Sequence, residues 1–133
     1  MHAAPLLDLP HAAVRERGTA ATSRAALERL TESEVSGFWI HVDADVLDPA
    51  VLPAVDSPEP GGLELDELAE LLRPLAHHPK ALGLELTIYD PTLDPDRTSA
   101  ARLATLLEEV LVEQDGPASL GDEAGDTHAM GRP

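Results

Sequence analysis

The segment that most constrains the fold is an apolar run that stops abruptly at acidic residues, FWIHVDADVLDP over residues 38–49. We expect a strand over residues 38–42, buried on both faces, because it is apolar on both sides apart from His41. Residues i and i+2 of a strand point to the same side, so Asp43 and Asp45 should converge at its carboxyl end, where open α/β sheets bind ligands. Two adjacent carboxylates are costly unless a cation compensates them. The pattern therefore predicts a divalent metal site.

The rest of the chain alternates between helical and strand patterns. We expect helices over residues 22–33 and from Leu65 to Leu75, the second with acidic residues in its first turn, where the helix dipole favours them. A second strand is expected over residues 81–89, and Thr98 or Ser99 should cap a final helix. This order is typical of an α/β fold with a parallel sheet and right-handed crossovers.

The remaining segments are less regular. Residues 1–18 are rich in alanine and proline, and residues 5–10 read as an edge strand or an ordered lead-in. Four prolines and two glycines make residues 47–62 a long loop, of a kind that is usually functional or disordered. The apolar period ends near Gln114. We therefore expect one domain over residues 1–114 and a disordered tail over residues 115–133.

Composition excludes several classes of function. A formal net charge of −16 and a pI near 4.4 argue against nucleic-acid and anionic-membrane partners. With no cysteine in the chain, disulfides, thiolate nucleophiles and cysteine-ligated zinc are excluded. The first ten residues do not resemble a signal peptide, and no apolar run reaches the roughly 20 residues that span a bilayer. We expect a soluble, cytoplasmic protein.

The acidic and histidine residues admit more than one interpretation. A lone aspartate at a strand end often bonds its own backbone in a turn, but Asp48, which precedes a proline, already supplies a turn signal here. Hard divalent cations such as Mn²⁺ and Mg²⁺ bind carboxylates, and two aspartates alone do not complete a site. His41 shares the side of Asp43, and it is either a metal-adjacent or proton-shuttle residue or a histidine packed and hydrogen-bonded inside the sheet. His77 and His78 are expected in a solvated turn at the opposite end.

The motif around these aspartates resembles a known family. The segment HVDADVLDP at residues 41–49, followed by Pro53 and by SPEPGGL at residues 57–63, is similar to the C-terminal metal motif of the ureohydrolases. These comprise arginases, agmatinases and formiminoglutamases. The strand GLELTIYDP at residues 83–91 resembles a later family strand that ends in an Asn-Pro turn. The resemblance covers roughly residues 8–113.

This resemblance implies the C-terminal portion of a three-layer α/β/α parallel-sheet, arginase-like fold. It implies a binuclear Mn²⁺ site at the carboxyl ends of the strands, with Asp43 as the metal-bridging aspartate and Asp45 as a ligand of one ion. Asp48 is expected to organise the loop. The implied activity is hydrolysis of a linear C–N bond in a small guanidino- or amidine-type substrate.

Two departures from the family pattern qualify these expectations. The other family ligands, a histidine and an Asp-x-His-x-Asp element, have no counterpart in this sequence. We therefore expect the second half of a metal site, in a truncated chain that is inactive alone. Ile88 stands where arginases place a glutamate that pairs with the substrate guanidinium, and Glu85 should face the other side of the strand.

Three hypotheses follow. The first is a truncated ureohydrolase-type hydrolase, and the second is a non-catalytic remnant or interaction module derived from that family. A deacetylase-like relative fits the glycine-rich loop less well. Because half of a parallel sheet leaves an exposed apolar edge, we expect either a homo-oligomer or pairing with a missing N-terminal half.

Overall fold

The structure, a computed structural model, describes residues 6–32 and 34–113. Its centre is a pair of parallel strands, β1 (Phe38–Asp43) and β2 (Ala81–Thr87). Helix α3 (Leu65–Ala76) makes the crossover between them, as the sequence order predicts. The register pairs His41 with Glu85 and Asp43 with Thr87.

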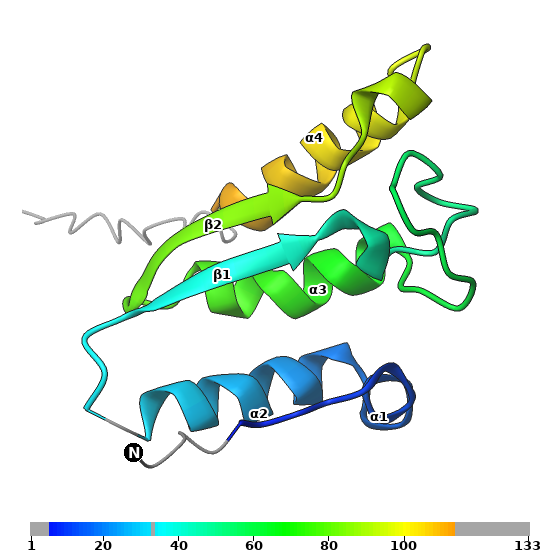
Figure 1. The fold of residues 1–133 in the computed structure, drawn as a ribbon. Helices are drawn as coiled ribbons and strands as arrows, with labels where there is room; N and C mark the ends of the chain where they lie inside the picture. Colours follow the sequence, from blue (N-terminus) through cyan, green and yellow to red (C-terminus); the bar gives the residue numbers. More distant parts are fainter. Residues whose placement is uncertain (1–5, 33, 114–133) are drawn as a thin grey trace, which may run out of the picture.

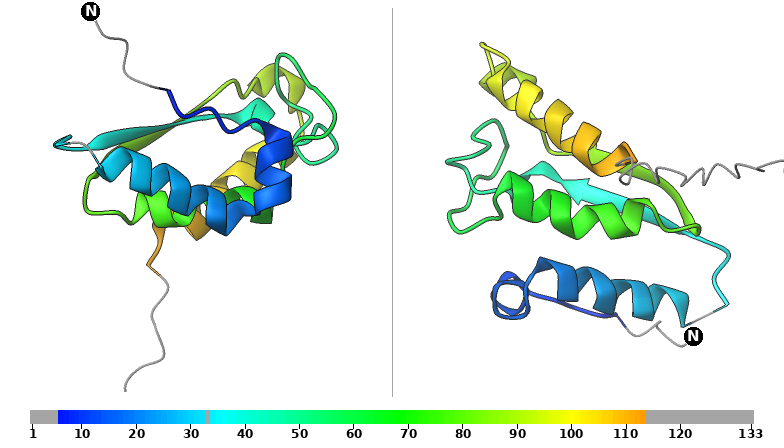
Figure 2. Two further views of the ribbon diagram at one scale, coloured as in Figure 1. Left: turned by 90° about the horizontal axis from the view of Figure 1, so that it is seen from below. Right: turned by 180° about the vertical axis from the view of Figure 1, so that it is seen from behind.

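Within the described residues, four α-helices accompany this sheet and lie on one side of it (Figures 1 and 2). They are α1 (His11–Arg17), α2 (Thr19–Thr31), α3 and α4 (Thr98–Leu111). Helix α3 begins at a capping box, in which Glu64 and Glu67 each accept from the other's backbone N–H. It continues through Pro74 to Ala76, one residue beyond the predicted Leu75.

The core forms where the helices meet the inner face of β1. Phe38, Ile40 and Val42 are buried against apolar residues of the helices, which include Leu68 and Leu72 of α3 and Leu103, Leu106 and Val110 of α4. The leucines of both helices recur at the spacing of one helical face, which is the spacing that a buried stripe requires. The arrangement is a partial arginase-like α/β fold, consistent with the predicted fold class.

The expectation that β1 is buried on both faces is wrong. Burial alternates along the strand, and Trp39 on the outer face is 57% exposed. Its indole lies where a Cβ at Gly83 would be, so the lack of a side chain on β2 makes room for the ring. No helix of residues 6–32 and 34–113 covers this face, which explains why an apolar residue there stays exposed (Figure 2).

The N-terminal segment also differs from expectation. Residues 11–17 form helix α1, whose Val14 is buried, and residues 6–10 form no strand. Pro10 stands at the N-cap, where its missing N–H costs nothing. Gly18, at φ +86°, separates α1 from α2. The predicted tail at residues 115–133 lies outside the described residues.

The long loop after β1 is ordered by buried side chains. Leu47, Leu52, Ala54 and Val55 are each at most 2% exposed. The backbone N–H of Asp90 donates to Ala54 O at 3.0 Å, so the loop is tied to the segment after β2. Within the part of the chain that the structure describes, no helix is long and apolar enough to cross a membrane.

Candidate metal centre

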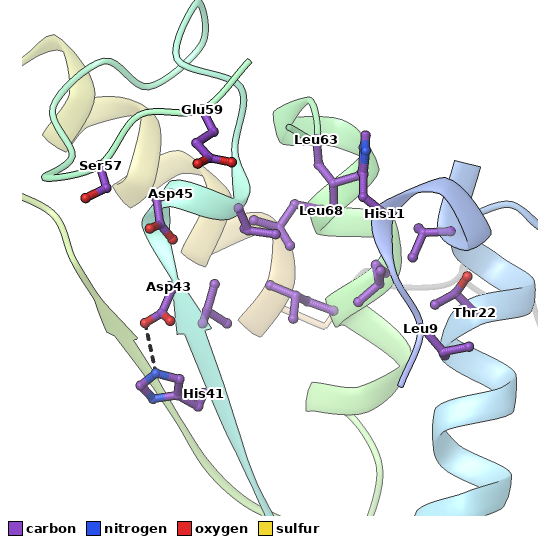
Figure 3. A pocket seen from close by; sticks show the side chains of 15 residues that line it. Leu9, His11, Thr22, His41, Asp43, Asp45, Ser57, Glu59, Leu63 and Leu68 are labelled. Atoms are coloured by element: carbon purple, nitrogen blue, oxygen red, sulfur yellow. Dashed lines mark hydrogen bonds and ion pairs between the residues drawn. The ribbon is translucent and has the colours of Figure 1, made fainter. Parts of the chain in front are cut away.

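Asp43 is the last residue of β1, and its carboxylate meets groups from both strands. The Thr87 hydroxyl of β2 donates to Oδ1, and the same oxygen lies 2.9 Å from Nε2 of His41 (Figure 3). Both hydrogen bonds stabilise the charged carboxylate and so lower the pKa of Asp43, and the bond from the Thr87 hydroxyl has the larger effect. Asp43 therefore remains ionised at neutral pH, as a metal ligand must be.

His41 joins this carboxylate to a second one. Its Nδ1 lies 2.7 Å from Oε1 of Glu85, the register partner on β2. Hydrogen bonding to Glu85, and then to Asp43, raises the pKa of His41 above 6.5. The ring is 53% exposed, so the interpretation of His41 as a residue packed inside the sheet is wrong. When protonated, the ring donates to both carboxylates.

Asp45 does not belong to the strand. It lies in the short 3-10 helix η1 (Ala44–Val46), so strand alternation does not explain its position. Figure 3 nevertheless shows its carboxylate beside that of Asp43, on the same side of the end of β1. Asp45 is half-buried, and no donor among the described residues bonds to its carboxylate. It remains available to an external cation.

Both aspartates line a cavity of about 670 Å³. Ser57 and Glu59 of the long loop join them on one side (Figure 3). The other walls are mainly apolar and come from three helices and the segment before α1. The cavity thus combines an acidic end with an apolar body.

Asp48 and two glycines hold the loop that carries Ser57 and Glu59. The carboxylate of Asp48 accepts from the backbone N–H of Ala50 at 2.9 Å and of Gly61 at 2.8 Å, which lower its pKa. Gly61 has φ +94°, and a Cβ on Gly62 would collide with the backbone of Leu47 and Asp48. The loop-organising role predicted for Asp48 is confirmed, and the glycine pair is explained by local geometry.

The carboxylates of Asp43 and Asp45 are ligands of the type that hard cations prefer, but two carboxylates are too few to complete a metal site. Across residues 6–32 and 34–113, no cluster of three or more histidine, aspartate or glutamate side chains could hold a metal ion. Asp43 and Asp45 supply oxygen ligands of the kind that Mn²⁺ prefers. Their assignment as metal ligands remains a prediction.

The segment after β2 shows what the sequence reasoning missed. Ile88 has φ +72°, a strained conformation for a β-branched residue, so the strand ends at Thr87, short of the predicted residue 89. Asp94 is 5% exposed and accepts from the Tyr89 hydroxyl and from the N–H groups of Ser99 and Ala100 at the start of α4. The expectation that Thr98 or Ser99 caps this helix is wrong, because α4 begins at Thr98 and its first N–H groups bond to Asp94.

His77 and His78 do lie at the opposite end of the sheet, as predicted, but they are not simply solvated. Nε2 of His77 lies 2.8 Å from Val110 O and links α3 to α4. The His78 ring lies 5.7 Å from that of Phe38 and its Nδ1 accepts from Lys80 N. His77 remains exposed, as predicted, whereas His78 is half-buried.

Comparison with known proteins connects this geometry to a family. The family model described as the arginase family matches residues 9–112, which include both aspartates and the glycine pair. The chain belongs to the arginase family. It is 38% identical over 95 residues to formimidoylglutamase of Bacillus subtilis, and 32% identical over 98 residues to arginase of Brucella melitensis. These matches cover 71% and 74% of this chain but 30% and 32% of the relatives.

Solved structures of this family have the same fold. The crystal structure of Bacillus subtilis formimidoylglutamase aligns with a TM-score of 0.69 at 33% identity, over 76% of this chain and 31% of that one. An arginase structure from the same organism gives a TM-score of 0.72 at 22% identity, over 80% and 39%. The chain therefore spans about a third of the length of the relatives that it matches.

Proposed function

We propose that this chain supplies the Asp43–Asp45 portion of the metal centre of an arginase-family hydrolase. The observation that carries the proposal is the position of both carboxylates at the end of β1, within the matched family region. Asp43 is held ionised by Thr87 and His41, and Asp45 has no donor within the described part of the chain. The remaining ligands would come from outside the described residues.

The proposed reaction is hydrolysis of a C–N bond in an amidine- or guanidino-type substrate. When bound, a binuclear Mn²⁺ centre supplies hydroxide near neutral pH. In this chain, His41 orients the Asp43 carboxylate, while Asp48 holds the loop that places Ser57 and Glu59 beside it. Ile88 offers no carboxylate to pair with a guanidinium, which argues against arginine as the substrate. The 38% identity to a formimidoylglutamase favours a formimidoyl substrate instead.

A non-catalytic role is the second candidate. Its support is the bonding of Asp43 to His41 and Thr87, which satisfies this carboxylate without a cation. In that case the chain would retain the fold as an interaction module.

Manganese binding tests the proposal. The chain would be co-expressed with the part of Bacillus subtilis formimidoylglutamase to which it does not align. The purified complex would then be titrated with Mn²⁺ by calorimetry. Binding should be lost in the Asp43→Asn/Asp45→Asn variant and retained in Glu108→Gln/Glu113→Gln, which makes the same charge change on and after α4. Binding that survives the first variant, or no binding by the complex, would contradict the proposal.

Activity provides the second measurement. The Mn²⁺-loaded complex should release formamide from a formimidoyl amino acid faster than it releases urea from arginine. Faster release of urea would contradict the preference assigned to Ile88.

A further inference from the structure

Two hydrogen bonds hold the Asp43 carboxylate, and both fall on the same oxygen. Oδ1 accepts from the Thr87 hydroxyl and lies 2.9 Å from Nε2 of His41 (Figure 3). No donor in the part of the chain that the structure describes bonds to Oδ2. The Asp43 side chain is 47% exposed, so packing alone does not fix its rotamer. The two bonds to Oδ1 therefore decide where the other oxygen points.

The His41 ring is held in turn by Glu85. Nδ1 of the ring lies 2.7 Å from Oε1 of Glu85, the residue opposite His41 in the register of β1 and β2. An imidazole ring turns readily about its Cβ–Cγ bond, and a hydrogen bond at each ring nitrogen opposes that rotation. Glu85 thus fixes the ring angle at which Nε2 meets Asp43.

Glu85 does not reach the acidic end of the cavity itself. His41 and Asp43 line the cavity, whereas Glu85 does not. The side chain of Glu85 is 50% exposed, and its carboxylate meets the His41 ring. Any influence of Glu85 on Asp43 therefore passes through this ring or acts at a distance through the charge of the carboxylate.

We propose that Glu85 is a positioning residue, which acts through His41 and sets the orientation in which the Asp43 carboxylate faces the cavity. This inference rests on the proposed function in that Asp43 is taken there as a metal ligand. Ligands that are ordered before binding lose less entropy when the cation arrives, so site rigidity raises affinity. Hydrogen-bond partners outside the ligand set typically change metal affinity by roughly 10–100-fold.

The orientation of Asp43 can be measured in the chain alone, without a metal. The measurement uses a Thr87→Val background, in which the bond from His41 alone holds the carboxylate. Three-bond couplings to Asp43 Cγ, read by nuclear magnetic resonance, should show one χ1 rotamer. Adding Glu85→Ala should give an average over several rotamers, because the ring is then free to turn.

Two variants control this measurement. Glu85→Gln keeps an acceptor for His41 and should restore the single rotamer of Asp43. Glu108→Ala makes the same change at an exposed position of α4 and should leave that rotamer unchanged. A single rotamer in the presence of Glu85→Ala, or averaging already present in Thr87→Val, would overturn the proposal.

Manganese affinity tests the consequence for the site. In the complex with the formimidoylglutamase segment, Glu85→Ala should weaken Mn²⁺ binding by roughly tenfold, and Glu85→Gln should recover most of the loss. The Glu85→Ala change should have little effect in a His41→Ala background, because the contact through which it acts is gone. An effect of charge alone would persist in that background and would not be rescued by glutamine, and this result would overturn the proposal.

The two measurements separate this proposal from the proposed function. Averaging of the Asp43 rotamer in Glu85→Ala, with no Mn²⁺ binding by the parent complex, would sustain the positioning role and contradict the metal centre. Equal Mn²⁺ affinity of the parent and Glu85→Ala complexes would sustain the metal centre and overturn the inference. Since the rotamer measurement contains no metal, the two failures are distinguishable.

Discussion

His41 on β1 and Glu85 on β2 are register partners whose side chains meet, with Nδ1 2.7 Å from Oε1. The pair joins the two strands on their outer face and places the other ring nitrogen 2.9 Å from Asp43 Oδ1. An alternation of residue types within either strand does not reveal this pair, because it depends on the register between them.

The His41–Glu85 bond should be visible in the titration of the histidine. Hydrogen bonds to Glu85 and Asp43 raise the pKa of His41 above 6.5, and the bond to Glu85 has the larger effect. Glu85→Gln should therefore lower that pKa. A raised pKa in the folded state stabilises the fold below pH 6.5, and this contribution is lost as the pH rises through the folded-state pKa. Nuclear magnetic resonance of the ring protons checks the shift. Glu108→Gln is the control, and an unchanged pKa in Glu85→Gln would disprove the assignment.

Gly62 should not tolerate a side chain. An added Cβ would collide with the backbone of Leu47 and Asp48. This backbone cannot move without disturbing the hydrogen bond between Gly61 N and the Asp48 carboxylate. Gly62→Ala should lower the free energy of unfolding by about 1–3 kcal/mol. Urea denaturation measures the change, with Ser57→Ala in the same loop as the control. Equal stability of Gly62→Ala and the parent chain would show that the close approach is absent.

Ile88 should be improved by a residue that accepts a positive φ. Its φ of +72° is unfavourable for a β-branched side chain, whereas asparagine adopts this region readily. Ile88→Asn should raise the free energy of unfolding by about 1 kcal/mol. The same change at Leu82, which is 69% exposed within β2, should be neutral or destabilising. Thermal denaturation compares the two, and a lower stability of Ile88→Asn would refute the prediction.

Asp94 should be needed for the start of α4. Burial opposes its ionisation, but the N–H groups of Ala100 and Ser99 and the Tyr89 hydroxyl outweigh burial and lower its pKa below 3.8. A lowered pKa stabilises the fold above pH 3.8, and that contribution is lost as the pH falls through the folded-state pKa.

Asp94→Asn should therefore lower the Tm at pH 7 and flatten the decline of Tm toward acid. Circular dichroism over pH 3–7 measures both changes. Asp56→Asn, at an exposed loop position, is the control. A parallel acid decline in Asp94→Asn and the parent chain would exclude this role.

The periodic parts of the fold could be predicted from the sequence. Buried faces can be recognised from the leucine stripes of α3 and α4 and from the apolar run of β1. Residues that share a buried face recur with the period of the helix or strand that carries them. Helix α1 was missed because it has seven residues and a single buried side chain, Val14, so it shows no period. The exposure of Trp39 was missed because a sequence does not tell which neighbouring layer covers an apolar face.

The candidate site was predicted in part. Asp43 and Asp45 were identified from their spacing, although Asp45 reaches its position through a 3-10 helix instead of a strand. Thr87 and Glu85 could not be found in this way, because they approach Asp43 and His41 from a strand more than 40 positions later in the chain. Their contribution depends on the pairing of β1 with β2.

The loop between β1 and α3 closes at its base. Leu63 N donates to Val46 O at 2.9 Å, Asp48 N donates to Leu63 O at 3.0 Å, and Asp48 Oδ2 accepts from Gly61 N. Changes in the length or sequence of the loop tip, near Ser57 and Glu59, should therefore leave the end of β1 in place. Evolution could exchange this tip for another of different length or chemistry and leave the two aspartates undisturbed, so the lining of the cavity could diverge while the acidic pair stays constant.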